Sequence, residues 1–301
     1  MWIILGLVSM LGLGIYDILK KQSLNDNAVL PVLFFATVSS ALLFVPTWIM
    51  SNTISGFDQY HNFYIPPVSA AFHAHVLLKT LVVISSWIFS YMALKNLPIS
   101  IVSPIRATGP IWTLVGAILI FGESLNTLQW IGMLVALICF YIFSFAGKSE
   151  GIHFKSNKWV WFIMLATLIG TLSTLYDKYL IGLYNRVAVQ AYFSFYQVLV
   201  MAIVLAVFWY PKRKHFTLFQ WRSVIPWIGI VLVLADFAYF YALTFEESLV
   251  SILSLLRRSS VIISFGIGAV LFKEKNKRKK GLILLGIIAG IYLIMLGSQA
   301  R

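Results

Sequence analysis

The sequence predicts an all-α integral membrane protein in which ten transmembrane helices form two inverted five-helix repeats. Apolar residues make up 60% of the 301-residue chain and charged residues only 11%, and the mean hydropathy is +0.89. Apolar runs of about 20 residues recur along the whole chain, and each is long enough to cross a hydrocarbon core of roughly 30 Å as a helix. The two halves of the chain also resemble each other. These observations exclude a soluble domain.

The apolar runs predict the ten helices in order. Their approximate ranges are 2–20, 28–50, 76–95, 98–121, 127–147, 159–182, 188–210, 224–244, 248–272 and 281–298. The first run lacks the basic start of a cleaved signal peptide, so we interpret it as a membrane helix. The connections are short except for residues 51–75, where we expect His61, His73 and His75 to be solvated. The single cysteine, Cys139, lies in a span and can form no internal disulfide.

The repeat is visible when residues 100–123 are compared with residues 251–274 at a constant offset. Seven of the 24 positions are identical, and four of these are polar: Ser100/Ser251, Ser103/Ser254, Arg106/Arg257 and Glu123/Glu274. Lipid-facing composition does not readily produce matched polar residues. The pair Tyr16-Asp17 in the first helix also matches Tyr176-Asp177 in the sixth. We therefore expect one repeat at 1–147, a connecting loop at 148–158 and a second repeat at 159–301.

An odd number of helices in each repeat has a topological consequence. The second copy must enter the membrane from the opposite face, so the repeats are inverted about an axis in the membrane plane. In that arrangement each half can adopt the conformation of the other, and one central site becomes open to either side in turn. The repeats therefore favour a transporter that works by alternating access.

Residues 91–143 also resemble an EamA-type repeat of the drug/metabolite transporter (DMT) superfamily. The resemblance lies in Ala93-Leu94 at the end of the third helix, Pro104 and Pro110 in the fourth, and Gly122-Glu123 at its close. The second half has Ala242-Leu243 and Glu274 but lacks the prolines. The resemblance implies ten helices in inverted five-helix repeats and secondary transport of small metabolites through a central cavity.

Charged residues inside the predicted spans are the strongest candidates for function, because a charge at the centre of a membrane helix costs roughly 2.5–3.5 kcal/mol on insertion scales. They are Arg106, Arg257, Arg258, Asp17, Asp177 and Asp236. We expect Asp17 to pair with Arg106 and Asp177 with Arg257, one pair on each side of a cavity, as gates. Asp236 and Arg258 have no counterpart in the other repeat, and Asp236 is a candidate for proton coupling.

The helical spacing places Ser103 on one stripe with Arg106, and Ser254 on the matching stripe with Arg257. Such stripes suit a carboxylate or phosphate, which a guanidinium binds with two parallel hydrogen bonds. Tyr16, Tyr176 and Gln197 are further candidates for binding substrate. The alternative is that the arginines are permanently paired with Asp17, Asp177 and Asp236 and only lock the helices together.

We therefore predict a secondary active transporter, an exporter or exchanger, of a small anionic or zwitterionic metabolite such as an amino acid, organic acid or phosphorylated compound. The alternative is a translocase or membrane enzyme that acts on a lipid-linked phosphate headgroup. Enzyme activity, cofactors, metal ions and nucleic acid are not expected. The expected partners are a small-molecule substrate and the lipid bilayer, for a chain that is a monomer or homodimer.

The distribution of Lys and Arg predicts the orientation in the plasma (inner) membrane. Sixteen of the 23 basic residues lie on the face reached by the loops between helices 1 and 2, 3 and 4, 5 and 6, 7 and 8, and 9 and 10. The opposite face has Lys79, Lys178, Arg186 and Arg301. Because basic loops stay in the cytoplasm, both termini are expected outside it.

Overall fold

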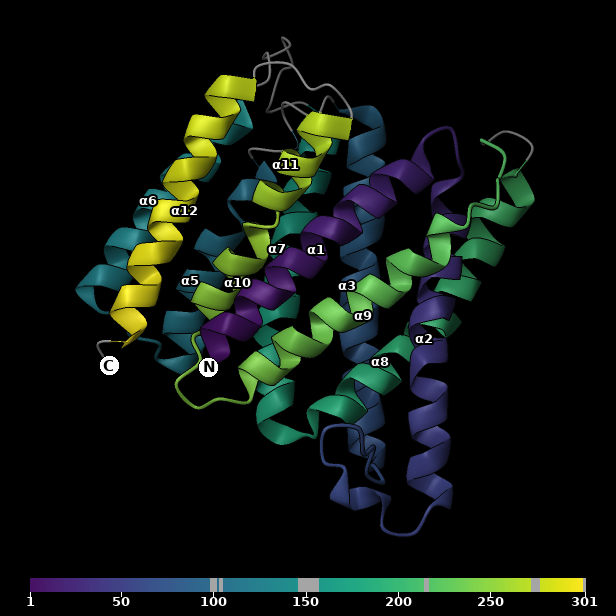
Figure 1. Cartoon of the computed structure of the whole chain (residues 1–301). Helices are drawn as coiled ribbons and strands as arrows, with labels where there is room; N and C mark the ends of the chain where they lie inside the picture. The colour runs from purple at the N-terminus through teal and green to yellow at the C-terminus, as the bar shows by residue number, and fades with distance from the viewer. Residues whose placement is uncertain (98–101, 103–104, 146–156, 214–216, 272–276, 300–301) are drawn as a thin grey trace. The chain divides into compact units, whose positions relative to one another are not determined.

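The structure is a computed structural model that describes residues 1–97, 102, 105–145, 157–213, 217–271 and 277–299 (Figure 1). Across these residues the secondary structure is helical, without a β-strand. The first half comprises α1 (Trp2–Leu24), α2 (Val29–Thr53), the short 3-10 turn η1 (Phe57–Gln59), α3 (Ala70–Asn96), α5 (Gly109–Phe121) and α6 (Thr127–Phe145).

The second half contains five further spans, one of them divided into two pieces. They comprise α7 (Lys158–Leu183), α8 (Arg186–Val204) with the π-helical segment η2 (Leu205–Trp209) and the 3-10 turn η3 (Tyr210–Lys212), α9 (Val224–Leu243), α10 (Val250–Arg258), α11 (Val261–Leu271) and α12 (Lys277–Gln299). With α10 and α11 taken as one span, the described residues form ten helices, as predicted. Five spans per half make the repeats inverted, because an odd number returns the chain to the opposite face.

Seven of these helices are long and apolar enough to cross a membrane by themselves, with 19 to 26 residues and a mean hydropathy of at least 1.6. Residues Ile105–Phe121 and Thr127–Phe143 form shorter apolar helices. A helix satisfies all of its internal backbone hydrogen bonds, which is the requirement for crossing lipid. The chain is therefore a multi-pass membrane protein.

The third helix begins earlier than the hydropathy predicts. α3 starts at Ala70 instead of residue 76, because the Ser69 hydroxyl accepts a hydrogen bond of 3.2 Å from the backbone N–H of Phe72 and so caps the helix. His73 and His75 thus lie on α3 and not in a solvated loop. His61 remains exposed in the connection before it.

The fourth and ninth spans are both interrupted, and at matching positions of the repeat. Thr108 has φ −75° and ψ −14° just before α5, and Ser259 has φ −68° and ψ −3° just after α10. At each break a backbone N–H donates a hydrogen bond to the carbonyl three residues earlier. Thr108 N–H donates to Ile105 O at 3.1 Å, and Ile262 N–H donates to Ser259 O at 2.9 Å. The offset of 151 residues that reveals the repeat also relates the two breaks.

Proline explains the interruption in the first repeat, where Pro110 lies in the first turn of α5 and cannot donate a helical hydrogen bond. The second repeat has Val261 there and uses hydroxyls instead. Ser259 Oγ donates to the Leu255 carbonyl at 2.9 Å, and Ser264 Oγ donates to the Ser260 carbonyl at 3.2 Å. Serine back-bonding of this kind bends and weakens a helix. Two different sequences therefore produce the same break.

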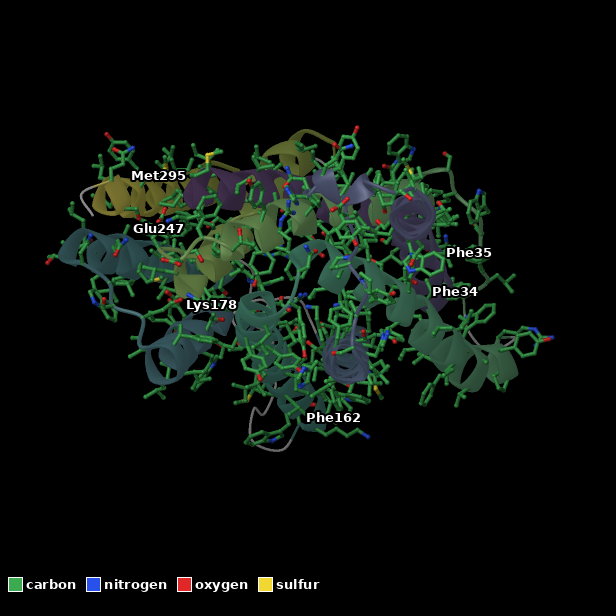
Figure 2. All side chains as sticks on the ribbon, turned by 90° about the horizontal axis from the view of Figure 1, so that it is seen from below. Phe34, Phe35, Phe162, Lys178, Glu247 and Met295 are labelled. Atoms are coloured by element: carbon green, nitrogen blue, oxygen red, sulfur yellow. The ribbon has the colours of Figure 1, made fainter. Side chains whose placement is uncertain are left out.

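A carboxylate holds the start of α10 in place. Glu123 accepts hydrogen bonds from the backbone N–H groups of Val250 at 2.6 Å and Ser251 at 3.2 Å, and from the Ser251 hydroxyl at 2.6 Å. Lys178, labelled in Figure 2, forms an ion pair with the same carboxylate at 2.9 Å and donates to the Ser248 carbonyl at 2.6 Å. A negative charge at a helix N-terminus is stabilised by the unpaired N–H groups and the helix dipole.

The chain folds into two compact units that do not coincide with the two repeats. Unit 1 contains residues 1–84 and 179–246, and unit 2 contains residues 85–178 and 247–301. In unit 1, α1 packs lengthwise against α9, and α2 packs against α8 and α9 (Figure 1). In unit 2, α6 packs along α12, and α5 packs against α10. Each unit therefore combines helices from both repeats.

Small residues allow these helices to approach closely. A Cβ added to Gly229 of α9 would overlap the Ala36 carbonyl oxygen of α2 and lie 2.9 Å from the Ser40 backbone nitrogen. In unit 2, a Cβ on Gly132 would lie 2.5 Å from the Gly290 carbonyl oxygen. Aromatic packing adds to unit 1, where the Phe34 and Phe35 rings on α2 meet edge to face at 5.3 Å (Figure 2). Close backbone packing replaces the hydrophobic effect, which lipid removes.

Gly229→Ala is expected to lower the free energy of unfolding by about 1–3 kcal/mol, the usual cost of overpacking. Unfolding of the purified protein by heat or SDS, in detergent, measures the change. Gly182→Ala is the matched control, because a Cβ on Gly182 of α7 meets nothing within 4 Å. Equal stability of the two variants would contradict the close approach of α2 and α9.

Glu123→Gln is expected to lower the free energy of unfolding by about 3–5 kcal/mol, because it leaves the Lys178 ammonium without its buried counter-ion. The double variant Glu123→Gln/Lys178→Met should recover part of this loss, since it removes the stranded charge. The same unfolding measurement applies. A double variant with no recovery would show that the ion pair does not hold the start of α10.

Candidate functional site

The predicted arginines lie at the two helix breaks. Arg106 is exposed and lies two residues before Thr108, and Arg257 is half-buried and lies two residues before Ser259. Arg257 and Arg258 form the last turn of α10. The C-terminus of a helix bears a partial negative charge, which favours cations there. The end of α10 therefore favours Arg257 and Arg258 within an otherwise apolar span.

One of the predicted stripes contacts α5 inside unit 2. Ser254 of α10 donates a hydrogen bond of 3.1 Å to the Thr113 hydroxyl of α5. Thr113 also donates to the Gly109 carbonyl at 3.2 Å, and Thr171 of α7 donates to the same carbonyl at 3.4 Å. Hydroxyls thus satisfy the backbone at the start of α5. Ser103, the predicted counterpart of Ser254, lies outside the described residues.

The three predicted acidic residues differ in exposure. Asp17 of α1 is exposed, Asp236 of α9 is half-buried, and Asp177 of α7 is 7% exposed. Asp177 belongs to unit 2 together with Arg106 and Arg257, whereas Asp17 and Asp236 belong to unit 1. The pairs Asp17 with Arg106 and Asp177 with Arg257 stay predictions.

The predicted tyrosines and glutamine occupy buried or partly buried positions. Tyr16 packs on the apolar cluster of Val32, Ala36, Ile225 and Ile228 in unit 1, and the Lys20 ammonium lies 5.5 Å from its ring centroid. Tyr176 is half-buried in α7. Gln197 of α8 is 3% exposed, within an apolar helix. Their role in substrate binding stays a prediction.

Lys79 is a buried cation that the sequence reasoning placed with the charges of the outer face. It is 2% exposed, and its ammonium lies 4.3 Å from the ring centroid of Phe193 on α8 and 5.2 Å from that of Phe240 on α9. The misplaced start of α3 caused the error. A start at residue 76 puts Lys79 in the first turn, whereas the capped start at Ala70 puts it in the third.

The sequence also predicted Arg186 and Lys178 on the outer face, whereas in the structure both side chains contact other residues of the protein. Arg186 is 8% exposed, and its guanidinium carbon lies 4.5 Å from the ring centroid of Phe237 and 4.2 Å from that of Tyr241. Its Nη2 donates to Asn62 Oδ1 at 2.6 Å. The overlooked signal in the sequence is the aromatic pair Phe237 and Tyr241 on α9, which are four residues apart and so share one helix face.

Two histidines of α3 bond to tyrosines of unit 1. His73 Nδ1 and the Tyr196 hydroxyl lie 2.9 Å apart, and His75 Nδ1 and the Tyr184 hydroxyl lie 2.8 Å apart. Within the part of the chain that the structure describes, no three His, Cys, Asp or Glu side chains gather as metal ligands would. These histidines connect the start of α3 to α8 and to Tyr184, the residue that follows α7.

Comparison with known proteins agrees with this architecture. Among curated proteins, none matches the chain. A solved crystal structure, described only as that of a protein, aligns with a TM-score of 0.74 at 14% sequence identity and covers 99% of this chain and 97% of that one. The fold of this chain is thus similar to the fold of that crystal structure. The model of the EamA-like transporter family matches residues 1–145 and again residues 157–296. The chain therefore belongs to the EamA-like transporter family, in the DMT superfamily.

Proposed function

We propose that the protein is a secondary active transporter, an exporter or exchanger in the plasma (inner) membrane, for a small anionic or zwitterionic metabolite. One observation supports the proposal above the others. Two membrane helices are broken at equivalent points of the repeat, and an arginine lies two residues before each break. Interrupted helices near the membrane midplane form the substrate sites of many transporter folds.

The chemistry at the breaks supports an anionic group on the substrate. A guanidinium presents planar N–H donors that match a carboxylate or phosphate. α10 ends with two such residues, Arg257 and Arg258, followed by the paired hydroxyl residues Ser259 and Ser260. Ser254 lies one turn before Arg258, so it shares that face of α10. Arg106 and the Thr108 hydroxyl provide the same residue types at the other break.

The inverted repeats support alternating access. Each half has a break preceded by an arginine, so each half can adopt the conformation of the other with the same chemistry exposed. We propose Asp17 and Asp177 as the acidic partners that release an arginine in one state and hold it in the other. Transport uses no nucleotide in this proposal, because the sequence contains no Walker A motif.

Arg257→Gln is expected to raise the substrate KM by about tenfold or more, since a hydrogen bond to a charged group contributes about 1.5–3 kcal/mol. Uptake into proteoliposomes, measured with labelled organic acids, amino acids and sugar phosphates, tests this. Arg257→Lys should fall between wild type and Arg257→Gln, because it keeps the charge and loses the planar donor pair.

Arg213→Gln is the matched control, because Arg213 is exposed in a loop, where its guanidinium donates to the Tyr210 carbonyl. A KM unchanged in Arg257→Gln, with a fall only in thermal stability, would show that Arg257 locks helices and does not bind substrate. Wild-type protein that moves or cleaves labelled phospholipid and takes up no soluble anion would support the lipid-headgroup alternative instead.

The structure strengthens the case for termini outside the cytoplasm. Lys79, Lys178 and Arg186 are engaged within helices, so they no longer count as loop charges of the outer face. The connections on that face at 54–69, 122–126, 184–185 and 244–249 contain no Lys or Arg. Nearly all Lys and Arg residues of the loops then lie on the opposite face, which favours that face in the cytoplasm.

Cysteine labelling tests this orientation. In a Cys139→Ala background, Tyr60→Cys should react with a membrane-impermeant maleimide in intact cells, because Tyr60 lies in the outer connection and is 55% exposed. Leu218→Cys, at a position 72% exposed on the other face, should react only after permeabilisation. The reverse pattern would overturn the orientation.

A further inference from the structure

Arg186 is a buried arginine without an acidic partner at the outer end of unit 1. It begins α8 and is 8% exposed, and its guanidinium carbon lies 4.5 Å from the Phe237 ring centroid and 4.2 Å from the Tyr241 ring centroid. Among the residues that the structure describes, no carboxylate forms an ion pair with it. Two aromatic rings compensate only part of the hydration that a buried cation loses. The protein thus contains a buried positive charge that an anion would stabilise.

The hydrogen-bonding edge of this guanidinium is only half used by the protein. Nη2 of Arg186 donates to Asn62 Oδ1 at 2.6 Å, whereas Nη1 is buried and has no hydrogen-bond partner among the described residues. Nη1 and Nη2 together form the fork that binds the two oxygens of a carboxylate or phosphate. Asn62 therefore supplies one of the two oxygens that this fork can bind.

Asn62 belongs to the polar connection between α2 and α3, which also lies in unit 1 and covers Arg186 from the outer side. The next residue, Phe63, stacks its ring on that of Phe237 with the centroids 6.3 Å apart. Asn62 and Phe63 are both exposed, so the cover of the buried guanidinium borders the surface. Displacement of these two side chains therefore opens Arg186 to the outer side.

We propose that Arg186 is an outer anion-binding site in which Asn62 acts as an internal competitor. A carboxylate or phosphate group displaces the Asn62 side chain and binds Nη1 and Nη2 together. The positive end of the α8 dipole favours an anion at the same place. The inference rests on the proposed transport function for the role of this site, which is to receive an anionic substrate at the outer face, in addition to the arginines at the helix breaks.

The chemistry of the two ligands decides the direction of the exchange. The amide of Asn62 is neutral and offers one acceptor oxygen to the guanidinium, whereas an oxyanion offers two and neutralises its charge. The exchange therefore favours the oxyanion. Because the bond to Asn62 re-forms when the anion leaves, the competitor also weakens binding, and a transporter has to release what it binds.

Substitutions of Asn62 test the competition directly, because they leave the arginine in place. Asn62→Ala removes the competing oxygen and should tighten anion binding about tenfold or more, the effect of one hydrogen bond to a charged group. Asn62→Asp supplies an internal carboxylate and should weaken binding by a similar factor. Asn52→Ala and Asn52→Asp are the matched controls and should leave the affinity unchanged, because Asn52 is exposed on α2 and donates to the Trp48 carbonyl.

Isothermal titration calorimetry of the purified protein in detergent measures the binding. Succinate and glucose 6-phosphate are the probes, and the neutral compounds succinamide and glucose, which lack the oxyanion, should not bind. Arg186→Gln should weaken binding about tenfold or more. The double variant Arg186→Gln/Asn62→Ala should bind the probes no more tightly than Arg186→Gln, because the competition acts through this guanidinium. Thermal unfolding of each variant is recorded alongside.

A purely structural contact gives a different pattern. Both Asn62 substitutions would then lower thermal stability and leave the affinity for the probes unchanged, which would overturn the inference. The absence of binding of both probes to Asn62→Ala would overturn it as well. Stabilisation of Asn62→Ala by phosphatidylglycerol, without stabilisation by either soluble probe, would overturn it in favour of a lipid headgroup.

Uptake into proteoliposomes separates the fate of this inference from that of the proposed function. Saturable anion uptake that depends on Arg257 but on neither Asn62 nor Arg186 would overturn the outer site and leave the proposed function standing. Anion binding that follows Asn62 and Arg186, in a protein that takes up no anion, would overturn the proposed function, while the anion-binding site itself would stand.

Discussion

The structure depends on one constraint, that a backbone N–H or C=O inside lipid must find a partner within the protein. Continuous helices meet it with their own hydrogen bonds, and most of the chain consists of such helices. The fourth and ninth spans meet it differently at Thr108 and Ser259, where hydrogen bonds to the third residue interrupt the regular helical ladder. Hydroxyl groups from Thr113, Thr171 and Ser259 bond to carbonyls around these points. At both breaks, protein hydroxyls thus supply hydrogen bonds that lipid cannot.

The same constraint governs the charges. Glu123 lies where the N–H groups of α10 have no intrahelical partner. Arg257 and Arg258 lie in the last turn of α10, where the helix dipole favours cations. The two ends of this nine-residue helix thus attract opposite charges. A short helix within a span provides polar ends at membrane depth, which an uninterrupted helix does not provide. Breaking the span thus lowers the cost of placing charged side chains at the two ends of α10.

The sequence predicted those features that depend on composition summed over many residues. Ten spans, their order and the repeat follow from hydropathy and from matched positions such as Arg106 and Arg257, and the structure and the family confirm them. The start of α3 was wrong because a single serine, Ser69, decides it. The break after α10 was not foreseen, because serines produce it where the other repeat has proline. Such features depend on one local hydrogen bond, which hydropathy does not register.

The error at α3 changes how the charges of the chain are understood. Hydropathy treats Lys79, Lys178 and Arg186 as interruptions near the ends of spans, whereas the structure surrounds each with aromatic rings or a carboxylate. Phe193, Phe237 and Phe240 look like ordinary membrane residues in the sequence, because nothing local distinguishes a ring that faces lipid from one that faces a cation. The contact joins residues more than a hundred positions apart for Lys79. A cation buried in a membrane span is thus recognised by the rings that long-range packing brings to it.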